Sequence, residues 1–223
     1  MKKFLFASIL ALALSPAAAL AQDPAPTATP SPTPAPAHAS HEYSPLVEKT
    51  VNYKNWSLPS LTADKSEDLR ALMAGKKLVM IVYFAPWCGN WRNEAPIAAK
   101  LYDKYKAQGF QVIGVSEYAT KDDVRNYFGK DGPPYPIVTE SESREDKQKT
   151  AHYGYRQLTG DKRNWGSPWN IFLEPAKVSA NGDVLTEKAF VVNGELIEDE
   201  VDKFIASKVG GTAASAVIQP CKN

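Results

Sequence analysis

The chain has 223 residues, of which 26 are basic and 25 acidic, and hydrophobic residues make up 43% of it. This length is enough for one folded domain of ordinary size and too short for two once the terminal segments are set aside. Basic and acidic residues are nearly equal in number, and the basic ones form no stripe along the sequence, so we predict no nucleic-acid partner.

The first 21 residues have the three parts of a secretory signal peptide. Lys2 and Lys3 precede an apolar run that extends to Leu14, and small residues follow as far as Ala21. The apolar run is shorter than the about 20 residues that a membrane-spanning helix needs, so cleavage before Gln22 is favoured over retention as an anchor. We therefore predict export to the periplasm or cell envelope, with no membrane span after cleavage.

Residues 22–41 are almost entirely Pro, Ala, Thr and Ser. Such a segment cannot bury enough apolar surface to fold, so we predict a disordered linker in which His38 and His41 are solvated. The predicted domain occupies residues 42–209, and residues 210–223 form a flexible tail that carries Cys221.

Hydrophobic periodicity predicts strands that alternate with helices. A continuous apolar run of strand length indicates a central strand buried on both faces, and apolar residues three and four apart indicate an amphipathic helix. On these patterns the first half of the domain holds a strand at 78–84, a helix from 91 to about 109, a strand at 110–115, a helix at 121–128 and an edge segment at 136–138.

The second half contains weaker patterns. The polar stretch 140–149 is predicted to become helical through Tyr153, a third strand covers 170–173, and a closing helix covers 195–208. Asn181-Gly182 predicts a tight turn, and hence a hairpin between 177–178 and 184–185. Strands that alternate with helices predict an α/β layer architecture.

Cys88 lies between the predicted strand at 78–84 and the helix that follows it. A helix start presents unpaired amide donors and a partial positive charge, which favour thiolate over thiol and make the sulfur nucleophilic. A lone cysteine also serves in many proteins as a small buried hydrophobe. Its position on a strand-to-helix turn favours the reactive interpretation.

The segment 82–89 (Val-Tyr-Phe-Ala-Pro-Trp-Cys-Gly) resembles the strand and turn of thioredoxins. The residues that follow, 91–96 (Trp-Arg-Asn-Glu-Ala-Pro), resemble the C-R-x-E-x-P continuation of TlpA/ResA-like periplasmic thiol-disulfide oxidoreductases. The resemblance covers roughly residues 56–208 and implies a thioredoxin-like α/β fold, with a mixed central β-sheet flanked by helices. It also implies a glutamate near the thiol, Glu94, and a cis proline facing the cysteine, Pro168, preceded by Ser167.

The chain departs from this family where its motif has a second cysteine, because Trp91 occupies that position. In the two-cysteine mechanism the second thiol resolves the mixed disulfide, which a tryptophan cannot do. The buried acid of thioredoxins is also replaced, by Val82, and residues 157–165 resemble an insertion beside the site. Glu94 fits two interpretations, a catalytic acid and a solvated residue on the helix surface.

Four tryptophans lie in or beside the motif and the proline loop: Trp87, Trp91, Trp165 and Trp169. They predict either an aromatic substrate groove, formed by Trp87, Trp91, Ser167 and Trp169, or a bulky shield around Cys88.

Cys221 leaves three possibilities open. The tail after the last helix spans about 40 Å when fully extended at ~3.3 Å per residue, which is long enough to reach Cys88. Cys221 is therefore a distant resolving thiol, the partner of Cys88 in a static disulfide, or a loose thiol or one that pairs with another molecule.

Three functions follow from these residues. The first is a thiol-disulfide oxidoreductase with Cys88 as its nucleophile, resolved by an external thiol or by Cys221, acting on protein or small-molecule thiols and disulfides. The second is a binding module on a scaffold that has lost its chemistry. The third and weakest is a one-cysteine peroxidase. We predict a monomer without cofactor. Because His152 is far from Cys88 in sequence, no Cys–His nucleophile pair is expected, and because no metal-ligand spacing is present, no metal is expected.

Overall fold

The computed structural model describes residues 40–210 of the chain. The predicted signal peptide, all but the end of the predicted linker, and Cys221 with its tail lie outside the described residues. Among the residues described, no helix is both long and apolar enough to cross a bilayer.

Ten strands and five α-helices alternate along the described part of the chain, with short 3-10 turns between some of them. In chain order they are β1 (Tyr43–Ser44), β2 (Val47–Lys54), β3 (Ser57–Pro59), β4 (Ser66–Asp68), α1 (Leu69–Met73), β5 (Leu78–Phe84), α2 (Gly89–Tyr105), β6 (Phe110–Ser116), α3 (Lys121–Phe128), β7 (Ile137–Thr139), α4 (Ala151–Thr159), β8 (Trp169–Leu173), β9 (Val184–Val192), β10 (Glu195–Leu196) and α5 (Glu198–Val209).

Six strands form the central sheet, in the order β2-β9-β8-β5-β6-β7. Strands β5, β6 and β7 run parallel, whereas β8 is antiparallel to β5, so the sheet is mixed. Every residue of β5 is buried, as its unbroken apolar run predicts for a central strand. The parallel strands β5 and β6 end at the same edge of the sheet, and Cys88 follows β5 at that edge.

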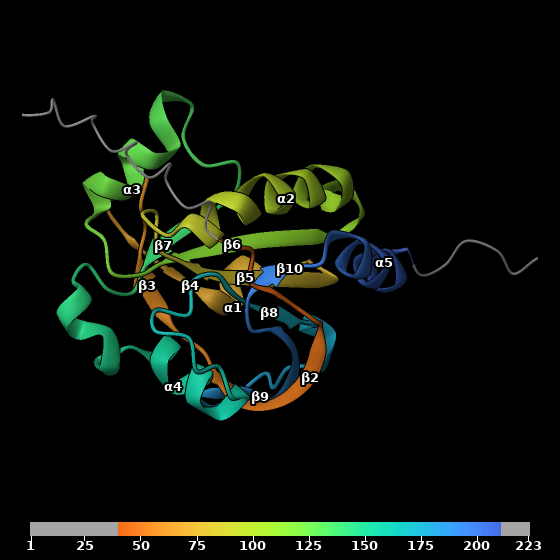
Figure 1. Cartoon of the computed structure of the whole chain (residues 1–223). Coiled ribbons are helices and arrows are strands. Elements are labelled where there is room, and N and C mark those ends of the chain that lie inside the picture. The colour runs from red at the N-terminus through yellow and green to blue at the C-terminus, as the bar shows by residue number, and fades with distance from the viewer. Residues whose placement is uncertain (1–39, 211–223) are drawn as a thin grey trace, which may run out of the picture. The chain divides into compact units, whose positions relative to one another are not determined.

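Two hydrophobic cores cover the two faces of the sheet. Helices α2, α3 and α5 pack on one face and α1 and α4 on the other, and α2 lies alongside α5 in Figure 1. Side chains of β5 alternate between the cores, so Phe84 faces α2 while Tyr83 faces α4. The structure is thus the thioredoxin-like α/β fold that the resemblance implies.

Most predicted elements are confirmed, and three details differ. Residues 177–178 do not form a hairpin strand, because Pro175–Lys177 is a 3-10 turn and β9 pairs instead with β8 and β2. The closing helix begins at Glu198 rather than at 195, because 195–196 pair with β1 as β10. The predicted helical end at 153 belongs to α4, which continues to Thr159.

The N-terminal boundary of the domain differs as well. His41, predicted to be solvated, stacks on Tyr43 with 4.9 Å between ring centroids. Its Nδ1 lies 2.8 Å from Oε2 of the buried Glu195. The reason is that β1 pairs with β10, which brings the end of the predicted linker onto the domain.

Candidate functional site

Cys88 is the N-cap of α2, a helix of 17 residues. Its backbone N–H bonds to the Ala85 carbonyl at 2.9 Å, and its own carbonyl accepts from the Arg92 N–H at 3.1 Å. The side chain makes no cap hydrogen bond and is half-buried. The sulfur therefore lies at the positive end of a long helix, as the sequence predicts.

The proline loop faces this sulfur. The Ser167–Pro168 peptide bond is cis, which confirms the prediction, and Cys88 Sγ donates to the Ser167 carbonyl at 3.1 Å. The buried Ser167 hydroxyl in turn accepts from the Ala85 N–H at 2.8 Å. Ser167 thus joins the loop to the end of β5 through its side chain and to the reactive sulfur through its carbonyl.

The prediction that Trp91 lines a substrate groove is wrong. Its side chain is fully buried and stacks on Phe84 with 4.4 Å between ring centroids, and it also approaches Tyr127. The cause is helical geometry, since Trp91 stands first in the apolar stripe that α2 buries on the sheet. The residue in the place of the second cysteine is a core residue.

Trp169 is also misassigned to the groove. As the first residue of β8 it points into the core beneath α4, where it is fully buried and lies parallel to Tyr155. Its indole Nε1 donates to Asn193 Oδ1 at 2.8 Å. Of the predicted groove tryptophans only Trp87 reaches the surface.

A pocket adjoins Cys88 on the side of Trp87. It has a volume of about 510 Å³ and forms where β5 and β6 end, bounded by α3. We call it the arginine pocket, and its lining residues are Pro86, Trp87, Arg92, Tyr118, Asp123, Asn126, Tyr127 and Arg144.

The sequence analysis singled out neither Arg144 nor Tyr118. The Arg144 guanidinium lies 4.0 Å from the centroid of the Trp87 ring, and the Trp87 Nε1 donates to the Tyr118 carbonyl at 3.1 Å. Tyr118 has a left-handed backbone with φ of 58°, which is rare for a bulky residue and is found at functional sites. The available signal was its position two residues after a buried parallel strand.

Glu94 is fully buried, so its interpretation as a solvated surface residue is wrong. Its Oε2 accepts from the Leu196 N–H at 2.8 Å and from Asn170 Nδ2 at 3.2 Å, which joins α2 to β10 and β8. Burial raises the pKa of Glu94 to about 8, against the lowering effect of these two hydrogen bonds. Glu94 stands six residues into the helix from Cys88, a rise of about 9 Å along its axis.

A second buried acid, Glu117, follows β6 and was not predicted. Its backbone N–H bonds to the Phe84 carbonyl at 2.8 Å, and its Oε2 accepts from the Ser141 hydroxyl at 2.7 Å. Burial, reinforced by the Glu140 carboxyl, raises the pKa of Glu117 well above its ordinary value. Two buried acids, Glu94 on α2 and Glu117 after β6, therefore have pKa values that burial raises.

His152 is fully buried behind the motif, stacked on Tyr83 with its Nδ1 3.2 Å from the Tyr118 hydroxyl. Burial, with the nearby Arg156, lowers the pKa of His152 well below its ordinary value and keeps the imidazole neutral. Its contacts run to tyrosines rather than to Cys88, as the sequence predicts.

Residues 160–168 form the loop that carries the cis proline, and buried charges hold it in place. Asp161 accepts from Arg156 and Arg163, and the Arg163 NH2 group donates to the Pro168 carbonyl at 2.7 Å. Gly166 has φ of 60°, and a Cβ there would overlap the Arg156 guanidinium. Of the segment 157–165, which resembles an insertion, the first three residues end α4 and the rest lie in this ion-paired loop.

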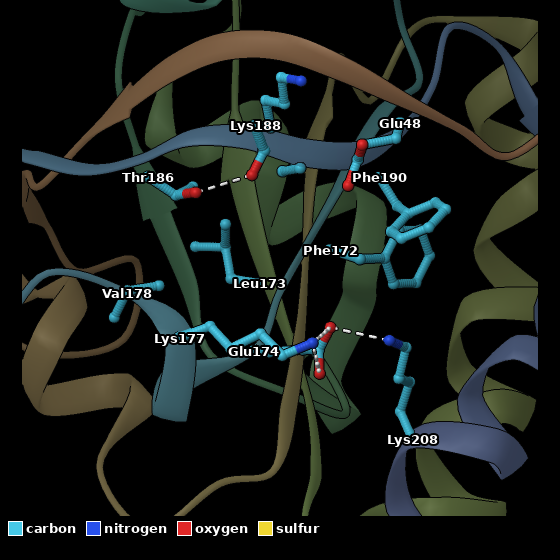
Figure 2. Close-up of a pocket in the computed structure, with 11 residues that line it drawn as sticks. Glu48, Phe172, Leu173, Glu174, Lys177, Val178, Thr186, Lys188, Phe190 and Lys208 are labelled. Carbon is cyan, nitrogen blue, oxygen red and sulfur yellow. Dashed lines mark hydrogen bonds and ion pairs between the residues drawn. The ribbon is translucent and has the colours of Figure 1, made fainter.

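Figure 2 shows another pocket, of about 160 Å³, which we call the lysine pocket. It lies at the far end of β8, where Leu173 pairs with Val79, whereas Trp169 at the other end of β8 pairs with Tyr83 near the motif. Glu174 accepts from both Lys177 and Lys208, so three of the five charged side chains that line this pocket are paired with one another. Within residues 40–210 no group of three or more His, Cys, Asp or Glu is arranged to hold a metal ion.

The chain was compared with known protein families and solved structures. Residues 21–173, more than half of the chain, match the Redoxin family. The chain belongs to the Redoxin family. Its fold is shared with a thioredoxin-family thiol:disulfide interchange protein from Chlorobium tepidum TLS, at a TM-score of 0.51 and 22% identity over 71% of this chain and 95% of that one.

Curated relatives of this Redoxin-family chain match over shorter stretches. A probable protein disulfide-isomerase A4 from Caenorhabditis elegans is 30% identical over 93 residues, which are 41% of this chain and 13% of the relative. The thiol-disulfide oxidoreductase ResA from Bacillus subtilis is 27% identical over 66 residues, which are 30% of this chain and 37% of the relative. The chain thus spans well under half the length of these two relatives.

Proposed function

We propose that this chain is an exported thiol-disulfide oxidoreductase that works through the single motif cysteine, Cys88. The Cys88 thiolate attacks one sulfur of a substrate disulfide, a new S–S bond forms, and the second substrate sulfur leaves as a thiolate that takes up a proton. An external thiol then attacks the substrate sulfur of the mixed disulfide, which releases the Cys88 thiolate and leaves the external thiol joined to the substrate. Alternatively Cys221 attacks the Cys88 sulfur, which releases the substrate thiol and leaves a Cys88–Cys221 disulfide that an external thiol reduces. The substrates are protein or small-molecule thiols and disulfides.

One observation carries this proposal: the Cys88 sulfur lies at the start of a long helix and against the carbonyl that precedes a cis proline. The helix start directs unpaired amide donors and a partial positive charge toward the attacking sulfur, and Cys88 is half-buried rather than fully enclosed. A relative supports the same chemistry, since the thiol-disulfide oxidoreductase ResA is 27% identical to this chain over 66 residues.

The test is the rate at which Cys88 reacts with a thiopyridyl disulfide at pH 7. Four full-length proteins are compared: the unaltered chain, Cys88→Ser, Cys221→Ser and the double variant. We expect Cys221→Ser to react at least about tenfold faster than N-acetylcysteine, because a helix start favours the thiolate. A rate equal to that of N-acetylcysteine, or no reaction of Cys88 in the folded protein, would refute the proposal.

Resolution separates two versions of the mechanism. If Cys221 resolves the mixed disulfide, the unaltered chain releases a bound thiol without added reductant and Cys221→Ser does not. If an external thiol resolves it, both proteins hold the bound thiol until a thiol is added. Mass spectrometry of the isolated mixed disulfide distinguishes the two results.

A second candidate is a binding module without turnover, favoured by the burial of Trp91 where the second thiol would stand. Capture of a partner from the cell envelope by the unaltered chain and by Cys88→Ser discriminates between them. Equal capture supports binding alone, and loss of capture in Cys88→Ser supports redox work. Peroxide consumption by the purified protein tests the one-cysteine peroxidase in the same preparation.

Export is part of the proposal, with residues 1–21 as the signal peptide, 22–41 as the linker and 42–209 as the domain. Its support is the residue pattern at the N-terminus. N-terminal sequencing of protein recovered from the cell envelope is expected to begin at Gln22. A chain that still begins at Met1 would contradict cleavage.

A further inference from the structure

The arginine pocket contains two guanidinium groups that no acid neutralises. Arg92 donates through Nε to the Pro86 carbonyl at 3.1 Å, and Arg144 lies over the Trp87 ring. In residues 40–210 neither forms an ion pair within 4.0 Å, whereas Arg125, Arg156 and Arg163 each do.

The one acid in the pocket is already engaged. Asp123 accepts from the Thr120 hydroxyl at 2.7 Å and from the Thr120 N–H at 3.2 Å, forming the capping box of α3. With two arginines against this single carboxylate, the lining of the pocket carries a net positive charge. Its remaining walls are largely aromatic, from Trp87, Tyr118 and Tyr127.

The pocket is joined to the reactive sulfur by the chain itself. Trp87 is the residue before Cys88, and the Arg92 N–H bonds to the Cys88 carbonyl. The pocket forms at the carboxyl ends of the parallel strands β5 and β6, the edge where ligands bind in sheets of this kind. A group bound there contacts the residues on both sides of Cys88 in the chain, Trp87 before it and Arg92 one helical turn after it.

We propose that the arginine pocket binds an acidic side chain of the peptide substrate, one or two residues from the cysteine that reacts with Cys88. A carboxylate suits the site because guanidinium groups pair with it through planar, charge-assisted hydrogen bonds, and the aromatic walls accommodate the adjoining chain. This inference rests on the proposed function, since it assigns a substrate preference to the same sulfur.

The reaction itself is a thiol-disulfide exchange. The Cys88 thiolate forms an S–S bond to the peptide sulfur, the bond between the peptide and its leaving thiol breaks, and the leaving thiolate takes up a proton. Cys88 and the peptide sulfur end in a disulfide while the leaving thiol is reduced. The pocket contributes by holding the peptide carboxylate while the sulfurs meet.

The test uses blocked tetrapeptides that differ at one position: Gly-Cys-Glu-Gly, Gly-Cys-Gln-Gly and Gly-Cys-Lys-Gly, each activated as the same thiopyridyl disulfide. A second set moves the variable residue one position further from the cysteine. The released thiopyridone gives the second-order rate for full-length Cys221→Ser. We expect the Glu peptide of at least one set to react about three- to tenfold faster than its Gln counterpart at low salt, and the Lys peptide to react slower.

Two variants and one matched control locate the effect. In Arg92→Gln/Arg144→Gln we expect the Glu/Gln rate ratio to fall to about 1, because no unpaired guanidinium remains in the pocket. Lys203 is an exposed residue of α5 that lies outside the pocket. Lys203→Gln removes its charge and is expected to leave the Glu/Gln rate ratio unchanged. Urea unfolding and circular dichroism of each variant show whether the domain remains folded, and the Glu/Gln ratio is compared within each protein so that a general change in rate cancels.

The outcomes separate the two proposals. Equal rates for all peptides in both sets, or a preference that survives the double arginine variant, overturns the acidic subsite and leaves Cys88 as a working nucleophile. Failure of Cys88 to react with any peptide overturns the proposed function and the subsite with it.

Discussion

The two ends of strand β8 lie in regions that differ in whether their charged side chains form ion pairs. At its far end, in the lysine pocket, Glu174 accepts from Lys177 and Lys208 at 2.9 and 2.8 Å. Although partial burial opposes the change, these hydrogen bonds lower the pKa of Glu174. At its near end, around Cys88, Glu94 is buried and hydrogen-bonded to Asn170 and Leu196. Within residues 40–210 neither Glu94 nor the two pocket arginines form an ion pair.

The difference indicates which end is built for a ligand. Charged groups that are already paired within the protein gain little from binding a charged ligand. Unpaired charges and acids with a raised pKa, in contrast, concentrate at functional sites. The Cys88 end also contains the left-handed Tyr118. We therefore expect substitutions at this end to have large effects on pH dependence and stability, and substitutions at the far end to have small ones.

The largest effect we expect concerns Glu94. The pKa of its carboxyl is near the ordinary value of 4.5 in the unfolded chain and is raised by burial to about 8 in the folded protein. Between these values only the unfolded chain releases the proton, so the free energy of unfolding falls as pH rises from 4.5 to 8, by at most about 5 kcal/mol over 3.5 units. Below pH 4.5 the group contributes no such slope.

Glu94→Gln removes this titration while keeping the shape of the side chain. Urea unfolding at pH 5, 6, 7 and 8 is expected to give a clearly flatter profile than that of the unaltered protein. Glu117→Gln is the matched control, since it removes the other buried acid and leaves the contribution of Glu94 in place. A profile of Glu94→Gln as steep as that of the unaltered protein would show that Glu94 ionises normally.

The next effect concerns Trp91. Because this fully buried ring stacks on Phe84, Trp91→Ala is expected to lower the free energy of unfolding by about 3–5 kcal/mol through lost burial and the cavity left behind. Trp87→Ala, at a half-buried ring one turn earlier, is the control and is expected to cost less. If urea unfolding showed equal losses of unfolding free energy for Trp91→Ala and Trp87→Ala, Trp91 would not be a core residue.

Ser167→Ala tests the link between the proline loop and β5. It leaves the buried Ala85 N–H without its acceptor, which costs about 1–3 kcal/mol. We also expect slower thiopyridyl disulfide exchange at Cys88, because the carbonyl facing the sulfur belongs to the same residue. Ser167→Thr keeps the hydroxyl and is expected to recover part of both losses. Unchanged stability and exchange rate in Ser167→Ala would dismiss this link.

The centre of the fold could be predicted from the sequence because its signals are local. The apolar run 78–84 and the stripe that follows it predict β5 and α2 directly. The segment 42–77 gave no such signal, because β2 is mostly exposed and β3 and β4 have three residues each. The turn at 181–182 was interpreted as a hairpin because a 3-10 turn and a short strand look alike over two or three residues.

The site was predictable in part for a similar reason. The apposition of Cys88 and Ser167 follows from the family resemblance, although 79 residues separate them. Trp91 was assigned to the substrate groove because it is close to Cys88 in sequence. Its place in the apolar stripe of α2 already indicated that its side chain is buried. The approach of Arg144 to Trp87 depends on how a polar loop folds back, which no spacing in the sequence encodes.

The smallest effect belongs to the lysine pocket. Lys208→Gln removes one of the two cations on Glu174, where both side chains are about one quarter exposed, so we expect a loss of about 0.2–1 kcal/mol in urea unfolding. The remaining Lys177 still neutralises Glu174, and the Glu/Gln peptide ratio at Cys88 is expected to stay unchanged. A change in that ratio would mean that the two ends of β8 are coupled, and the contrast between a paired and an unpaired end would no longer explain where substrate charge is recognised.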